Sequence, residues 1–152
     1  RCFIVGFRND IDASEFAFPV LDGQPLPLRL ALEQDVSDEF TISDRRWDGH
    51  KRRTEANLAR GAGFTAFEAD LERPANTMVA RYYKDGKECL IPQAGKNPRM
   101  LTPRECANLQ GFPSWFTPHK SKSSAYKQFG NAVPVPLVRE VGREILAVLR
   151  KN

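Results

Sequence analysis

The sequence predicts a mixed α/β fold in which the two ends of the chain and its middle form different regions. Three observations carry this prediction. An apolar run opens the chain at residues 2–7, an Asp-Gly pair lies between two apolar stretches at residues 85–86, and apolar side chains recur at helical spacing from Leu137 to Leu149. We expect one sheet strand and one long helix from the ends, and a β-hairpin from the middle.

Composition narrows the class of protein. The chain has 152 residues, of which 41% are hydrophobic and 28% are charged, so it can bury a core and is not disordered throughout. Its net charge of +4 favours anionic partners, although proteins that bind no nucleic acid often carry as much. Cys2, Cys89 and Cys106 stand far apart, which excludes a zinc knuckle and favours a reducing, cytoplasmic setting. No apolar run approaches the ~18 residues of a membrane span.

The first expected element is a buried strand at residues 2–7, because buried strands are short continuous apolar runs. The run follows Arg1 directly, with no initiator Met, so we expect the chain to continue a longer protein. Residues 11–36 alternate apolar patches with prolines and a glycine, which predicts an irregular connector.

A basic helix is expected from a cap at Ser43 to about Arg60. Its charged side has two interpretations. It is a solvated face, or it holds phosphates together with the glycine-rich residues 61–63, where the backbone can approach a partner closely. The expected inward residues are Trp47, Thr54 and Leu58, and the cations are Arg45, Arg46, Lys51, Arg52, Arg53 and Arg60.

A β-hairpin is expected over residues 76–91, because Asp85 and Gly86 form the strongest short hairpin signal between apolar stretches. The cations and aromatic rings of residues 81–84 suit nucleic acid and equally suit a half-exposed strand pair. Further on, Thr102 and Glu105 form a capping box that begins a short helix ending near Gly111. Cys106 faces inward on that helix and is expected to be a buried structural thiol.

The last expected elements are a turn at Gly130 and Asn131 and a helix that Pro136 begins. Glycine there permits an unusual backbone angle and asparagine offers a donor and an acceptor, so the turn suits a ligand, or it is an ordinary turn before a helix. The apolar side of the helix needs a surface to pack on. That side contains Leu137, Val138, Val141, Ile145, Val148 and Leu149.

Four segments carry a family resemblance. Residues 99–113, RMLTPRECANLQGFP, resemble the ninth conserved block of the DNA cytosine-5 methyltransferases. Residues 125–133, AYKQFGNAV, resemble the tenth block, and residues 1–8, RCFIVGFR, resemble the eighth without its start. Between the eighth and ninth blocks the family has a variable target-recognition domain, and TMVARYYKDG at residues 77–86 is similar to its Thr-Leu core, with Met78 in place of leucine.

The resemblance implies an architecture. Residues 1–36 would be the end of the catalytic-domain sheet and a connector, and residues 37–118 would be the target-recognition domain with the ninth block. Residues 119–152 would carry the tenth block and a C-terminal helix that returns to the catalytic domain. The fold class is therefore mixed α/β, with a partial catalytic-domain strand and helix plus a small, mostly β target-recognition domain.

The resemblance also implies an activity. Such enzymes transfer methyl from S-adenosylmethionine to a cytosine flipped from double-stranded DNA. Their Pro-Cys and Glu-Asn-Val blocks and their Phe-x-Gly-x-Gly cofactor turn do not occur here. The chain is therefore expected to be inactive alone, with the N-terminal catalytic portion as a covalent neighbour or a separate subunit. The alternative is a non-catalytic, sequence-specific DNA-binding module or specificity subunit.

Carried over residue by residue, the resemblance gives candidate site residues. Arg1 would contact the flipped cytosine, and Asn131 and Ala132 would border the S-adenosylmethionine pocket. No metal ligands are expected. The candidate DNA-binding residues are Thr77, Met78, Arg81, Tyr82, Tyr83, Lys84 and Arg104.

Overall fold

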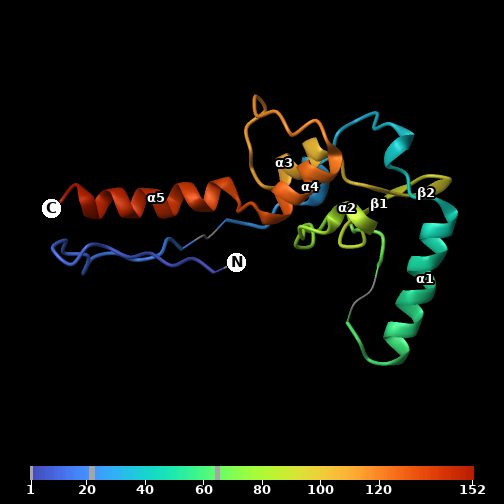
Figure 1. Cartoon of the computed structure of the whole chain (residues 1–152), viewed down its shortest axis with the longest axis horizontal. Helices are drawn as coiled ribbons and strands as arrows, with labels where there is room; N and C mark the ends of the chain where they lie inside the picture. The colour runs from blue at the N-terminus through green and yellow to red at the C-terminus, as the bar shows by residue number, and fades with distance from the viewer. Residues whose placement is uncertain (1, 21–22, 64–65) are drawn as a thin grey trace. The chain divides into compact units, whose positions relative to one another are not determined.

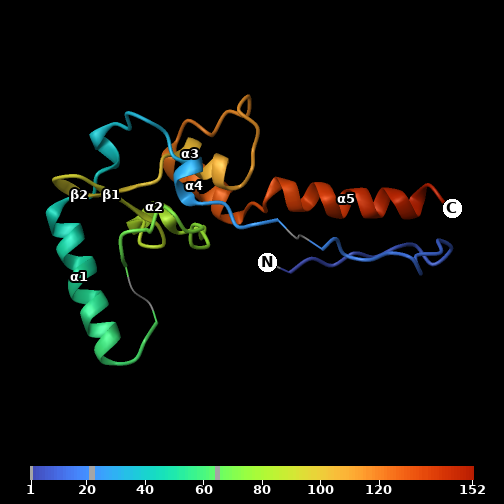
Figure 2. The same ribbon diagram turned by 180° about the vertical axis from the view of Figure 1, so that it is seen from behind.

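The structure, a computed structural model, describes residues 2–20, 23–63 and 66–152 (Figures 1 and 2). It divides into two compact units. The first contains the described residues up to Gln24 together with those from Val133 onward, and the second is Pro25–Ala132. No helix in these ranges is long and apolar enough to cross a membrane. The elements are the 3-10 helices η1 (Leu28–Ala31) and η2 (Asp38–Phe40), the helices α1 (Asp44–Ala59), α2 (Tyr82–Asp85), α3 (Pro103–Leu109), α4 (Lys122–Asn131) and α5 (Val135–Leu149), and the strands β1 (Leu90–Gln93) and β2 (Lys96–Met100).

In the first unit, the N-terminal segment lies along α5 (Figures 1 and 2). The backbone N–H of Asp12 donates to the side-chain oxygen of Asn152 at 2.9 Å, and the Asn152 amide donates back to the Asp12 carbonyl at 3.2 Å. The predicted final helix is confirmed, and it begins at Val135, one residue before Pro136. Its apolar side is only partly covered, because Val141 and Val148 are buried whereas Val138 and Leu149 are 42% and 44% exposed.

The predicted strand at residues 2–7 is wrong for the structure as described. Within residues 2–20 no strand is formed, and neither strand of the described sheet pairs with this run. Ile4 is 92% exposed, and its neighbours Phe3 and Val5 are half-buried. An extended run becomes a strand only when a second strand satisfies its backbone groups, and no described residue does so here.

In the second unit, the predicted basic helix is confirmed as α1. The Ser43 hydroxyl accepts from the Arg46 backbone N–H at 3.4 Å and caps the helix. Thr54 is buried as expected, but Leu58 is 57% exposed, and the helix instead buries His50 and Asn57. Irregular backbone precedes α1, as predicted, apart from η1 and η2.

The predicted hairpin at Asp85–Gly86 is wrong. Gly86 has a φ of 66°, but it ends the short helix α2 in the left-handed conformation that closes many helices. The hairpin lies further along the chain, where β1 and β2 pair antiparallel across a turn that contains Gly95. Residues 37–118 are therefore not mostly β, because among their described residues three α-helices, α1, α2 and α3, accompany one two-stranded sheet.

The capping box is confirmed. The Thr102 hydroxyl accepts from the Glu105 N–H at 3.0 Å, and the Glu105 carboxylate accepts from the Thr102 N–H at 2.7 Å.

The expected turn at Gly130 and Asn131 is wrong, because both residues lie in the last turn of α4. Glycine is needed there for close packing rather than for an unusual backbone angle. A β-carbon on Gly130 would lie 2.4 Å from the backbone of Ala80.

The core of the second unit gathers β1, α2, α3 and α4 (Figure 1). Its fully buried members include Tyr82, Leu90, Leu101 and Cys106. The rings of Tyr82 and Tyr126 meet edge to face with centroids 5.3 Å apart. The core therefore lies directly beneath residues 77–86, which resemble a recognition segment.

Candidate nucleic-acid interface

Residues 77–86, here called the 77–86 segment, have a buried side and an exposed side. Met78 is 7% exposed and Tyr82 is fully buried, four residues later along the chain. The exposed side chains of the segment include those of Thr77, Val79, Arg81, Tyr83 and Lys84.

Tyr82 anchors the segment. Its hydroxyl donates to the Cys89 carbonyl at 2.7 Å and accepts from the Leu101 N–H at 2.8 Å. Tyr82 thereby connects α2 to the residue that precedes β1 and to the residue that follows β2. Burial, which disfavours the phenolate, raises the pKa of Tyr82 well above its ordinary value. Tyr82 and Met78 were expected among the DNA-binding residues, but both side chains are buried in the structure.

Two glycines fit the segment closely to its neighbours. A β-carbon on Gly86 would meet the Met100 side chain at 2.6 Å, and one on Gly130 would meet the Ala80 backbone at 2.4 Å. The segment is therefore seated on β2 at one end and on α4 at its middle. Such tight seating fixes the backbone of Arg81, which is next to Ala80.

A hollow of about 660 Å³, the Thr77 hollow, lies beside the exposed side of the segment. Thr77 and Arg81 line it, as does Glu88, whose Oε2 is buried without a hydrogen-bond partner in the described part of the chain. Hydroxyl, guanidinium and carboxylate groups are those with which proteins contact base edges in DNA. The other lining residues are Gly63, Asn76, Val79, Ala80 and Lys87.

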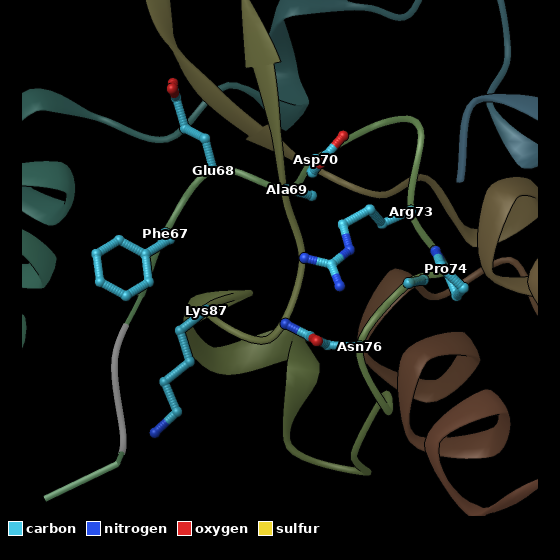
Figure 3. Close-up of a pocket in the computed structure, with 9 residues that line it drawn as sticks. Phe67, Glu68, Ala69, Asp70, Arg73, Pro74, Asn76 and Lys87 are labelled. Carbon is cyan, nitrogen blue, oxygen red and sulfur yellow. The ribbon is translucent and has the colours of Figure 1, made fainter. Parts of the chain in front are cut away.

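A second hollow, the Arg73 hollow, has a volume of about 370 Å³ and shares Asn76 and Lys87 with the first. Figure 3 shows the Arg73 guanidinium and the Asn76 amide pointing toward its middle, whereas the Glu68 and Asp70 carboxylates point away. Its other lining residues are Phe67, Ala69, Pro74 and Ala75. Periodicity and motifs gave no signal for Asn76, which precedes Thr77 in the sequence, or for Arg73, Lys87 and Glu88, which only the folded chain brings to these hollows.

Asn131, Ala132 and Arg104 line neither hollow, and Arg1 lies outside the described residues. Asn131 is exposed in the last turn of α4, and Ala132, which ends that helix, is half-buried. Arg104 is half-buried and donates from Nη2 to the Phe116 carbonyl, while its Nη1 is buried with no hydrogen-bond partner among the described residues.

Neither buried cysteine, Cys89 or Cys106, is an activated thiol. Cys106 is fully buried on α3, which confirms the expected buried thiol. Burial raises its pKa well above the ordinary value and raises that of Cys89 to about 12, with the nearby Glu105 carboxylate as the next cause in both. Since the thiolate is the nucleophile, neither residue has the environment of a catalytic cysteine.

Comparison with known proteins assigns the family. The C-5 cytosine-specific DNA methylase family matches residues 1–147. The chain is 47% identical over 156 aligned residues to the type II methyltransferase M1.ScrFI of Lactococcus lactis subsp. cremoris, covering 100% of the chain and 40% of that relative. It is 46% identical over 152 residues to M.NlaX of Neisseria lactamica, covering 98% of the chain and 47% of the relative. The chain therefore belongs to the C-5 cytosine-specific DNA methylase family.

A solved structure agrees in fold. The S. pombe Dnmt2 methyltransferase matches with a TM-score of 0.63 at 17% identity, over 86% of this chain and 44% of that one. The chain spans less than half the length of each relative named here. The likeness therefore concerns one part of a methyltransferase fold.

Proposed function

We propose that this chain is the target-recognition part of a DNA cytosine-5 methyltransferase. The observation that carries the proposal is the 77–86 segment, in which buried Tyr82 fixes the backbone while Thr77 and Arg81 line an open hollow. Rigid placement of a few polar groups is what base-specific contacts require. The substrate is double-stranded DNA, and the chain selects which cytosine is presented.

The same proposal includes the catalytic partner and the cofactor. The nucleophilic cysteine, the Glu-Asn-Val carboxylate and most of the cofactor pocket belong to the catalytic portion of the enzyme, as a covalent neighbour or a separate subunit. Arg1 would contact the flipped cytosine. The exposed amide of Asn131 offers a donor and an acceptor and fits the polar end of S-adenosylmethionine, with Ala132 beside it. When bound, that cofactor supplies the methyl group.

The exposed and buried residues have different roles in the proposal. Thr77, Arg81, Tyr83 and Lys84 contact the DNA, and Arg104 supports the start of α3 through its bond to the Phe116 carbonyl. Met78 and Tyr82 hold the segment from beneath. Substitution of an exposed residue is therefore expected to change binding without unfolding the chain, whereas substitution of Tyr82 is expected to do both.

The variants Thr77→Ala and Arg81→Ala test the proposed target choice. An enzyme is assembled by joining the chain to the portion of M1.ScrFI outside the matched region, and its preferred duplexes are selected from a randomised pool at fixed salt. Each variant is expected to lose about 1–3 kcal/mol of discrimination at one base pair, because a polar contact to a base edge is removed. Binding of the full chain to the selected duplex is measured in parallel.

Arg139→Ala is the control, because Arg139 is exposed on α5 and lines neither hollow, and its substitution removes the same charge as Arg81→Ala. It is expected to leave the selected sequence unchanged. An unchanged sequence preference in Thr77→Ala and Arg81→Ala would mean that the 77–86 segment does not choose the target.

A further inference from the structure

Arg73 stands on a fixed stretch of backbone. Its carbonyl accepts from the Leu28 N–H at 2.9 Å, and the Leu71 carbonyl accepts from the Arg29 N–H at 3.0 Å, so this turn is held against η1. Leu28 is 1% exposed and ties η1 to the core. On the other side, the Ala69 N–H donates to the Leu90 carbonyl of β1 at 2.7 Å. The base of the Arg73 side chain is therefore placed by the fold.

The Asp70 and Glu72 carboxylates near Arg73 bond to other groups, and the Glu68 carboxylate points away from the hollow (Figure 3). Asp70 accepts from the Glu72 N–H at 3.0 Å, and Glu72 accepts from the Arg29 guanidinium at 2.9 Å. Arg73 itself is exposed and forms no ion pair with any residue that the structure describes. A positioned guanidinium whose neighbouring acids bond to other groups is available to an external acceptor.

Amide and aromatic side chains surround Arg73. The Asn76 amide points into the same hollow, and the Phe67 ring, 58% exposed, lines it as well (Figure 3). Aromatic rings beside cations and amides are typical of nucleic-acid contacts. Because Asn76 and Lys87 also line the Thr77 hollow, the two hollows adjoin along one surface.

We propose that Arg73 is a specificity-determining residue that contacts the major-groove edge of a guanine in the bound DNA. Guanine presents two adjacent acceptors, N7 and O6, and the guanidinium has two parallel N–H donors that match them. Asn76 then faces the neighbouring base. The inference rests on the proposed function and extends the DNA-contacting surface beyond the 77–86 segment to residues that no motif marks.

Two substitutions separate a base contact from a phosphate contact. In the assembled enzyme, Arg73→Ala and Arg73→Lys are both expected to lose about tenfold to a hundredfold of the preference for guanine at one position, because lysine keeps the charge but lacks the paired donors. Arg73→Lys should retain the wild-type salt dependence of binding. Arg139→Ala, which removes an exposed arginine that lines neither hollow and pairs with no acid next to Arg73, is the control and should retain the preference.

A change in the DNA provides a second measurement that needs no variant. Replacing that guanine by 7-deazaguanine removes N7, and the replacement should weaken binding by the wild type several-fold and binding by Arg73→Ala much less. The proposal is overturned if Arg73→Ala weakens binding equally for all sequences and Arg73→Lys restores it, because that pattern indicates a phosphate contact. It is also overturned if Arg73→Ala causes no loss at all. Altered preference in Thr77→Ala with unchanged preference in Arg73→Ala overturns this inference alone, whereas unchanged preference in both overturns the proposed function as well.

Discussion

Replacing Gly130 by alanine is expected to destabilise the chain by about 3 kcal/mol, the upper end of the usual cost of overpacking. The added β-carbon would lie 2.4 Å from Ala80 Cα and N, and neither is the end of a flexible side chain that can move aside. Either α4 or the 77–86 segment must shift. The measurement is urea unfolding of the full chain, followed by circular dichroism.

Gly49→Ala is the matched control, because Gly49 lies within α1 in the same unit and its added β-carbon would meet nothing within 4 Å. Alanine there is expected to stabilise the helix by about 0.5–1 kcal/mol. Equal and small effects of the two substitutions would contradict the close seating of the 77–86 segment on α4.

Replacing Glu105 by alanine is expected to cost about 3–5 kcal/mol, the range for breaking a buried ion pair from one side. Glu105 is fully buried and accepts from both terminal nitrogens of Arg99, at 2.7 and 2.8 Å. It also accepts from the backbone N–H groups of Thr102 and Glu33, at 2.7 and 2.9 Å. Without it, a buried guanidinium and two backbone donors lose their acceptor.

The control for Glu105→Ala is Glu72→Ala, which breaks an arginine–carboxylate pair of the same unit whose side chains are 52% and 69% exposed. Its expected cost is below about 1 kcal/mol, because exposed pairs are screened by water. The free energy of unfolding of both variants is measured by thermal and urea unfolding. A loss in Glu105→Ala no larger than in Glu72→Ala would show that the buried network does not stabilise the fold.

The elements that the sequence predicts correctly are those whose signals are local. Ser43 caps α1, and Thr102 with Glu105 begins α3, because capping joins residues only three positions apart. The wrong hairpin shows where local signals become ambiguous. Glycine after aspartate suits a left-handed residue in a hairpin or at a helix end, and the burial of Tyr82, which depends on distant Leu101, favours the helix end.

The candidate site shows the same limit. Resemblance located Thr77 and Arg81, and the structure puts both on one hollow. Arg73 could not be found in this way, because it is marked only by contacts with η1 and by the pairing of Glu72 with Arg29, across separations of more than 40 residues along the chain. Nor does helical or strand periodicity distinguish an outward-facing arginine that contacts DNA from one that faces solvent.

The most direct test of the account is transfer of a labelled methyl group from S-adenosylmethionine to double-stranded DNA. It is measured for the chain alone, for the portion of M1.ScrFI outside the matched region, and for the two joined in one polypeptide. The account predicts transfer only by the joined protein, at sites that change in Arg81→Ala. Transfer by the chain alone would contradict it, as would DNA binding without transfer by a folded joined protein, which would indicate a non-catalytic DNA-binding module.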